Sequence, residues 1–133
     1  MEELAAVAVD CGLRMHRRLG PGMLESVYET ILGAALTRAG LSVERQKAIE
    51  IEYEGMHFKE GFRADLLVEG RLIIEIKAVE RLTPVHSRQL LTYLRLSGLP
   101  LGLLMNFGGD TFREGLKRVV NGHTASEAVS GRA

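Results

Sequence analysis

Three ionisable side chains in the middle of the chain have types and spacing that could support chemistry. Asp65 is followed ten residues later by Glu75, and Lys77 comes two residues after Glu75. Successive side chains on a β-strand point to opposite faces, so Glu75 and Lys77 share one face while Ile76 points to the other. Because the residues before Glu75 are Leu72-Ile73-Ile74, charged groups here are costly unless they are paired or hold a metal ion.

An Asp, a Glu and a neighbouring backbone carbonyl form an oxygen-rich set that suits Mg²⁺, which retains several of its water molecules. Lys77 would then lie beside a metal-bound water, where it could position a nucleophile or stabilise charge developing on phosphorus. The alternative is a solvated strand face on which Asp65 and Lys77 form an ordinary cross-strand ion pair.

A second polar pair follows a sharp turn near the N-terminus. Glu25 and Tyr28 are three residues apart, directly after Gly20-Pro21-Gly22, so they share one face of a helix. Glu25 could extend the acidic site, or it could serve the helix dipole or a capping box.

A third polar set lies on the helix that follows Lys77. Gln89 and Tyr93 are four residues apart and, with His86, form a polar stripe along one edge of an apolar leucine face. We expect this stripe to face the sheet edge that carries Asp65, Glu75 and Lys77. The alternative is that Gln89 and Tyr93 are partly buried and satisfy one another.

Hydrophobic periodicity predicts the elements that must position these residues. Val7, Cys11 and Met15 mark a helical stripe that ends at the glycine-proline turn. The expected order is α-α-β-β-β-α-β-α, with helices over about 4–19, 24–39, 84–97 and 111–120, and strands over 48–53, 62–68, 72–77 and 101–107. Residues 1–122 then form one α/β domain, and the tail, 123–133, is expected to be flexible.

The hairpin between the second and third strands gives a geometric test of the acidic site. A two-residue loop at Glu69-Gly70 would place Asp65 and Glu75 on opposite faces of the hairpin. A three-residue loop that includes Arg71 would pair Asp65 directly with Glu75, and such loops commonly place a glycine in the left-handed region. We therefore predict an odd-length loop, or a bulge with the same effect.

The pattern of Asp65 and Glu75-Ile76-Lys77 on a hairpin resembles the PD-(D/E)XK nuclease superfamily. Other blocks resemble its GxxExxY family, and the resemblance covers about residues 5–122. These blocks are His16 to Gly22, Gly22 to Tyr28, Arg63 to Val68, Gln89 to Leu94 and Leu104 to Gly108.

The resemblance implies a restriction-endonuclease-like core, in which a central four-stranded mixed sheet is flanked by helices. It implies that Asp65, Glu75 and the Ile76 carbonyl bind Mg²⁺ or Mn²⁺, that Lys77 is the catalytic lysine, and that Glu25 assists the metal site. Gln89 and Tyr93 match a Q-x-x-x-Y element of RecB-like and Cas4-like nucleases in the superfamily.

His16 also matches a position of the GxxExxY family. A lone histidine on a helix more often packs or forms a hydrogen bond than binds a metal. The pattern departs from the superfamily at Ala64, which stands where a proline often precedes the aspartate.

Composition limits the function classes that remain. The chain has 133 residues, with 17 Lys and Arg balanced by 17 Asp and Glu, so it lacks the basic excess of an indiscriminate nucleic-acid binder. Contact with nucleic acid must come from a local patch, for which the helix residues Arg88 and Arg95 are candidates. Cys11 is the only cysteine, which excludes a disulfide scaffold. The acidic N-terminus and the lack of a long apolar segment favour an intracellular, cytoplasmic protein with no membrane contact.

The sequence therefore favours a Mg²⁺-dependent phosphodiesterase that acts on DNA, and it leaves open whether the protein works as a homodimer or with a partner protein. The alternative is a catalytically silent module that keeps the fold and binds nucleic acid or a protein. Zero net charge favours the alternative, whereas the intact Asp65, Glu75 and Lys77 set favours the enzyme.

Overall fold

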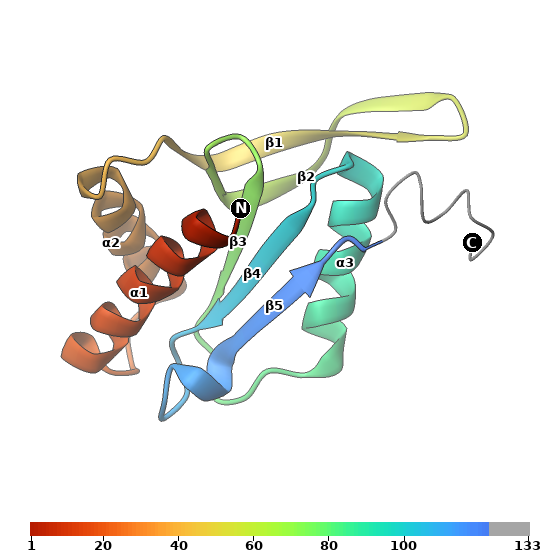
Figure 1. The fold of residues 1–133 in the computed structure, drawn as a ribbon. Helices are drawn as coiled ribbons and strands as arrows, with labels where there is room; N and C mark the ends of the chain where they lie inside the picture. Colours follow the sequence, from red (N-terminus) through yellow and green to blue (C-terminus); the bar gives the residue numbers. More distant parts are fainter. Residues whose placement is uncertain (123–133) are drawn as a thin grey trace.

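The computed structural model describes residues 1–122, and the predicted flexible tail, 123–133, lies outside the described residues. A five-stranded sheet forms the centre, with α1 and α2 on one face and α3 on the other (Figure 1). The elements in chain order are α1 (Glu2–Leu19), α2 (Glu25–Arg38), β1 (Val43–Tyr53), β2 (Met56–Val68), β3 (Leu72–Lys77), α3 (Pro84–Ser97), β4 (Leu101–Asn106), a short 3₁₀ turn η1 (Arg113–Gly115) and β5 (Leu116–Val120).

The strands lie in the order β1-β2-β3-β4-β5. Only β3 and β4 are parallel, and α3 connects them, whereas the other neighbouring pairs are antiparallel. The sheet is therefore mixed, as predicted, and the α/β fold is consistent with a restriction-endonuclease-like fold. It has five strands, so the prediction of four was wrong.

The extra strand replaces an expected helix. Residues 111–120 were predicted as a helix, but Leu116–Val120 pairs with β4 as an antiparallel edge strand. Its apolar residues Leu116 and Val119 are partly buried while Lys117 and Arg118 are exposed. This strand covers the side of β4, all six of whose residues are buried.

Alternate residues of the central strands divide the core into two parts. Ile74 and Ile76 pack with α1 and α2, in a cluster that also holds Tyr28, Leu32 and Phe107. Ile73, which precedes Ile74 and points to the other face, packs instead with the α3 residues Leu90 and Leu94 and with Leu104. Both faces of β3 are thus buried, which explains its continuous apolar run.

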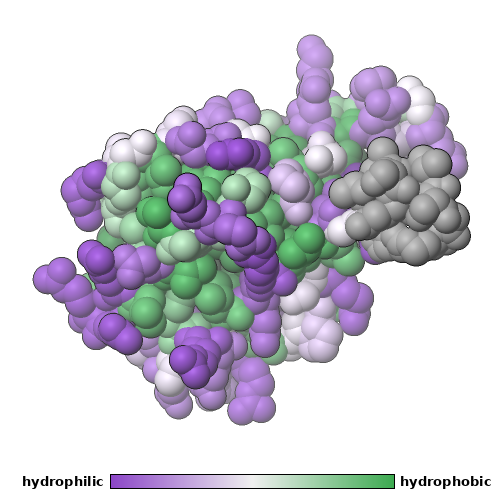
Figure 2. All heavy atoms as spheres, viewed as in Figure 1, coloured by the Kyte–Doolittle hydropathy of each residue, from purple (hydrophilic) through white to green (hydrophobic). Residues whose placement is uncertain are grey.

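The β1–β2 hairpin is longer than the sequence indicated and projects beyond the rest of the sheet (Figure 1). Near its tip, Tyr53 pairs with Met56 and Ile51 with Phe58, and a register shift lies between Ile49 and Ile51. Seen from the side of α1 and β5, apolar residues gather in the middle of the molecule and hydrophilic residues surround them (Figure 2). Within residues 1–122, no helix has the length and apolar composition needed to cross a membrane.

Candidate active site

The β2–β3 hairpin has the geometry that a shared acidic site requires. Val68 pairs with Leu72, and the ladder continues to Leu66 and Ile74. The intervening residues include Glu69 at φ 54° and Gly70 at φ 69°, and the Arg71 N–H donates to the Val68 carbonyl at 3.1 Å. The predicted three-residue loop with a left-handed glycine is therefore confirmed, and the continued register places Asp65 opposite Glu75.

Side chains replace the backbone ladder where it ends. The Asp65 N–H donates to Glu75 Oε2 at 3.1 Å, and the Ile76 N–H donates to Asp65 Oδ2 at 2.8 Å. Each carboxylate thus binds the backbone of the opposite strand. These reciprocal hydrogen bonds hold the two carboxyl groups close together between β2 and β3.

The environment of these two groups opposes their ionisation. Burial, followed by the nearby charge of Asp65, raises the pKa of Glu75 to about 8, although the charge of Lys77 opposes the shift. Burial also raises the pKa of Asp65, which its hydrogen bond from the Ile76 N–H partly offsets. Two carboxylates in this position need a positive partner to remain charged at neutral pH.

Lys77 lies on the same face of β3 as Glu75, two residues away, and is partly buried at the end of the strand. It pairs in register with Asn106 of the parallel strand β4. The lysine is therefore near the acidic pair, as the alternation of β3 predicted, and its charge acts on Glu75.

Tyr93 of α3 lies near the acidic pair of Asp65 and Glu75. Its ring stacks on Phe62 of β2, with centroids 3.9 Å apart and planes at 5°. Burial raises the pKa of Tyr93, and the charges of Glu75 and Asp65 contribute to the shift, so the phenol lies within their influence. Gln89 is exposed one turn earlier on α3.

His86, the other member of the predicted stripe, has a different position and role. Its Nδ1 accepts from the Thr83 N–H at 3.1 Å, in a capping box at the start of α3 where Pro84 is the first residue. The helix start is therefore fixed by His86, and the polar stripe reduces to Gln89 and Tyr93.

Glu25 and Tyr28 separate in space although they share one helix. Glu25 is the exposed first residue of α2, makes no side-chain cap there, and its charge raises the pKa of Asp65 and of Glu75. Tyr28 is fully buried, donates to the Gly20 carbonyl at 2.6 Å and accepts from the Met23 N–H at 3.2 Å. The charge of Glu25 thus acts on the acidic pair, whereas Tyr28 holds the turn between α1 and α2.

His16 likewise lies in the core beside this turn. It is buried, its Nε2 is 2.9 Å from the Gly109 carbonyl oxygen, and its ring stacks on Phe107. These contacts are those of a packing and hydrogen-bonding residue, which was the expectation for a lone helical histidine.

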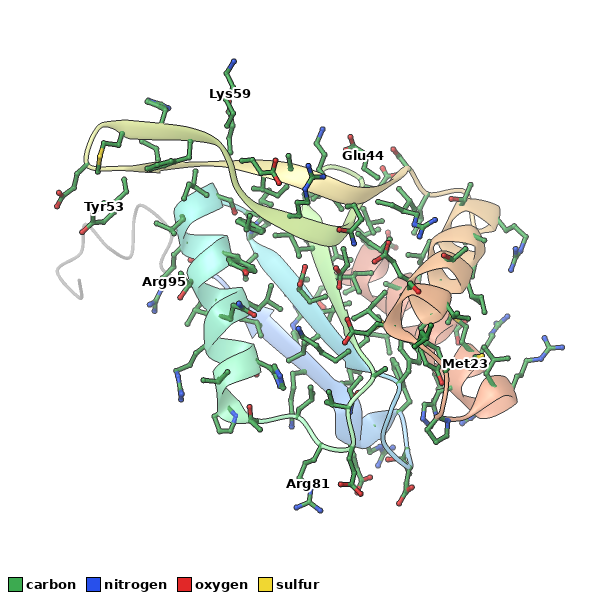
Figure 3. The ribbon with its side chains drawn as sticks, turned by 180° about the vertical axis from the view of Figure 1, so that it is seen from behind. Met23, Glu44, Tyr53, Lys59, Arg81 and Arg95 are labelled. Atoms are coloured by element: carbon green, nitrogen blue, oxygen red, sulfur yellow. The ribbon has the colours of Figure 1, made fainter. Side chains whose placement is uncertain are left out.

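Arg88 and Arg95 are exposed on α3. Arg95 points away from the body of the molecule, as does Arg81 in the loop that precedes the helix (Figure 3). In the same view α3 and α2 flank the sheet from two sides.

Two residues that sequence reasoning missed adjoin Asp65. Glu29, one turn after Glu25, is buried and pairs with Arg45 at 3.1 Å. Gln46 Nε2 donates to Glu29 Oε1 at 2.8 Å and to Asp65 Oδ1 at 3.3 Å, so one amide bridges two carboxylates. The four-residue spacing of Glu25 and Glu29 was a usable signal, but nothing in the strand pattern marked Gln46.

Gln46 also departs from ordinary strand geometry. Its φ is 48° in the middle of β1, where the paired residues pass from Arg45 and Leu66 to Lys47 and Ala64. Left-handed backbone at a non-glycine residue is uncommon and costs about 1–3 kcal/mol. The interruption lies opposite Asp65. At this residue β2 therefore loses its regular backbone pairing with β1, and its pairing with β3 ends.

The donor set fits a divalent metal ion. Carboxylate and carbonyl oxygens are the ligands that Mg²⁺ and Mn²⁺ prefer, and a bound cation would favour the ionised form of Glu75, whose pKa burial and the charge of Asp65 raise. Among residues 1–122, no group of three or more Asp, Glu, His or Cys side chains is arranged to hold a metal. Asp65 and Glu75 would therefore form a two-carboxylate site that backbone oxygens and water complete.

The fold and the site define an α/β protein whose central strands carry a facing acidic pair and a lysine. A protein-family model for the PD-(D/E)XK nuclease superfamily matches residues 2–119, and the chain belongs to that superfamily. Membership indicates a nuclease, and nucleases of this class generally use divalent metal ions. Comparisons with curated proteins and with solved structures gave no match.

Proposed function

We propose that the protein is a metal-dependent nuclease of the GxxExxY type that hydrolyses phosphodiester bonds in DNA. The observation that carries the proposal is the reciprocal pair of hydrogen bonds that holds Asp65 and Glu75 face to face, with Lys77 on the same strand face as Glu75.

Asp65, Glu75 and the Ile76 carbonyl would hold Mg²⁺ or Mn²⁺, and Glu25 would add negative charge from α2. The ion, when bound, lowers the pKa of a water molecule and neutralises charge on the phosphodiester. Lys77 donates hydrogen bonds that orient the attacking water and stabilise the charge that develops on the phosphate oxygens. Tyr93, on which the charges of Glu75 and Asp65 act, would border the site from α3, and Gln89 would lie one turn earlier on the same helix.

The arginines of α3 support a nucleic-acid substrate. Arg88 and Arg95 are exposed and seven residues apart, so they lie on one side of the helix. Guanidinium groups bind phosphates in a geometry that favours paired hydrogen bonds. A DNA strand bound along α3 would bring a phosphodiester past the face of β3 that holds Glu75 and Lys77.

Cleavage assays test the proposal directly. Purified protein would be incubated with single-stranded, duplex and branched DNA and with RNA, in Mg²⁺, in Mn²⁺ and in EDTA. We expect metal-dependent cleavage of DNA that is lost in Glu75→Gln and Lys77→Met. Lys59→Met is the matched control, since Lys59 is exposed on the β1–β2 hairpin and points away from the sheet (Figure 3).

The same assay separates the enzyme from a silent binding module, which the zero net charge of the chain favours. Cleavage that persists in EDTA or in both site variants would reject the acidic pair as its source. No cleavage of any substrate, with no Mg²⁺ or Mn²⁺ binding by calorimetry, would support a module that keeps the fold without the chemistry.

A further inference from the structure

Asn106 is a buried polar residue beside Lys77 that the proposed chemistry does not use. It is the last residue of β4 and only 2% exposed. In the parallel register it is the direct neighbour of Lys77. Leu104, two residues earlier on β4, packs on the α3 side with Ile73, so Asn106 and Lys77 share that face of the sheet.

The Asn106 amide binds the backbone of a single residue at two points. Its Nδ2 donates to the Val79 carbonyl at 2.8 Å, and its Oδ1 accepts from the Val79 N–H at 2.9 Å. Oδ1 also accepts from the Gly108 N–H at 3.1 Å. The Asn106 side chain thus forms the hydrogen bonds that a neighbouring backbone would form with Val79 if the pairing of β3 with β4 continued past Lys77.

Lys77 lies directly before this clamp and is held from its other side as well. The Phe107 N–H donates to the Lys77 carbonyl at 2.8 Å. The Phe107 N–H, just after β4, thus binds the Lys77 carbonyl and the Asn106 side chain binds Val79, so the backbone from Lys77 to Val79 is held at both ends, which fixes the direction in which the Lys77 side chain leaves the strand.

Two glycines show how closely the surrounding backbone approaches. A Cβ at Gly108 would lie 2.4 Å from the Val79 carbonyl oxygen, and a Cβ at Gly115 would lie 2.5 Å from the Asn106 carbonyl oxygen. Real Cβ contacts are never this short, so glycine is required at both positions. The backbone around Asn106 is therefore packed tightly against the segment that follows Lys77.

We propose that Asn106 is a positioning residue that fixes the direction of Lys77 toward the acidic pair. The inference rests on the proposed nuclease function, because it assigns Lys77 a task that needs a fixed direction. A displacement of about 1 Å in a reacting group can lower a rate by about 10²-fold, so a loosened Lys77 would slow the chemical step.

The variants are Asn106→Ala, which removes all three hydrogen bonds, and Asn106→Asp, which keeps the size but cannot donate to the Val79 carbonyl. Asn121→Ala is the matched control. Asn121 also ties backbone through Nδ2, to the Leu94 and Leu99 carbonyls at 3.1 Å each, but it follows β5 at the opposite end of the sheet.

We expect kcat to fall about 10- to 100-fold in the Asn106 variants. KM for DNA and the Kd for Mg²⁺ should change less than about threefold, because Asp65 and Glu75 are held by their own hydrogen bonds. Asn121→Ala should keep kcat per folded molecule.

A spectroscopic signal separates positioning from a merely structural role. The chain has four lysines, Lys47, Lys59, Lys77 and Lys117, so ¹³C-methylation of their amines gives a simple NMR spectrum in which Lys77→Arg assigns the Lys77 signal. We expect this signal to move in folded Asn106→Asp or Asn106→Ala protein and to stay in Asn121→Ala.

An unmoved Lys77 signal in both Asn106 variants would overturn the inference, whether or not the protein cleaves DNA. If wild-type protein cleaves nothing, the proposed function fails, while a moved signal would still support Asn106 as the group that directs Lys77.

Discussion

Protonation of Glu75 links the acidic site to the free energy of unfolding of the whole protein. Its pKa is about 8 in the metal-free fold against an ordinary value of 4.5. Between these values the folded protein binds more protons than the unfolded chain, so the free energy of unfolding falls as pH rises through that window. The raised pKa of Asp65 acts in the same direction.

We therefore predict that in EDTA the free energy of unfolding falls between about pH 5 and pH 8. Each unit of pKa shift corresponds to about 1.4 kcal/mol, so the loss is on the order of a few kcal/mol. Urea unfolding across this range measures it. Adding Mg²⁺ or Mn²⁺ at pH 8 should restore stability, since the ion binds the ionised carboxylates of the folded state.

Glu75→Gln should flatten this pH dependence, because the neutral amide has no proton to lose. Glu52→Gln is the control, as Glu52 is exposed on the β1–β2 hairpin. Equal slopes for wild-type and Glu75→Gln protein would show that other groups cause the pH dependence.

The two tyrosines of the predicted site have separate tasks, which a pair of hydroxyl deletions should reveal. Tyr28→Phe removes a buried hydrogen bond to the Gly20 carbonyl and should cost about 1–2 kcal/mol of unfolding free energy, with unchanged Mg²⁺ affinity. Tyr93→Phe should cost less stability, since its hydroxyl has no buried partner to orphan among the described hydrogen bonds, but should reduce cleavage. Thermal unfolding and single-turnover cleavage distinguish them, and a reversed result would place Tyr28 in the site.

At the scale of the elements, the local sequence pattern was sufficient to predict several of the helices and strands. The apolar spacing in α1, the proline at the start of α3 and the apolar run of β3 each predicted an element that the structure confirms. The buried face of α1 differs from the predicted stripe, because it includes Ala8 and Met15 but leaves Val7 exposed. Residues 116–120 were misread because the spacing of Leu116, Val119 and Val120 among basic residues also suits a short helix. Their strand geometry comes from pairing with β4, a partner distant in sequence.

The seating of α3 on the sheet depends on one small residue. A Cβ at Gly102 of β4 would lie 2.9 Å from both Cδ atoms of Leu90 and 3.0 Å from its Cγ, and Leu90 is buried. Gly102→Ala should therefore lift α3, lower the unfolding free energy by about 1–3 kcal/mol, and reduce cleavage by displacing Tyr93.

Gly109→Ala is the comparison, because its nearest contact would be 3.6 Å away and it should have little effect. The double variant Gly102→Ala with Leu90→Ala should recover the position of α3 and part of the cleavage rate. Failure of the smaller side chain to restore any activity would argue that Gly102 acts through something other than Leu90.

At the scale of the molecule, the site assembles from six elements, α2, β1, β2, β3, α3 and β4, and this limits what the sequence could reveal. Asp65, Glu75 and Lys77 could be found because a strand's alternation and one loop length relate them. Glu29, Gln46 and Asn106 could not, because their roles depend on hydrogen bonds between elements that only the packed fold brings together.

The zero net charge of the whole chain limits how strongly its DNA binding should depend on salt. With 17 positive and 17 negative side chains, the protein has no general basic field, so DNA must be held by a few local contacts. If Arg88 and Arg95 supply two of them, log K for duplex binding should fall with log salt at a slope of about −2, since each phosphate contact contributes about −0.9. Fluorescence anisotropy in EDTA measures binding without cleavage. Arg88→Gln and Arg95→Gln should each reduce the slope by about 1, while Arg38→Gln, on the groove between α1 and α2, should leave it unchanged. A slope that both α3 variants leave intact would move the binding surface away from α3, and with it the path of the substrate past Glu75.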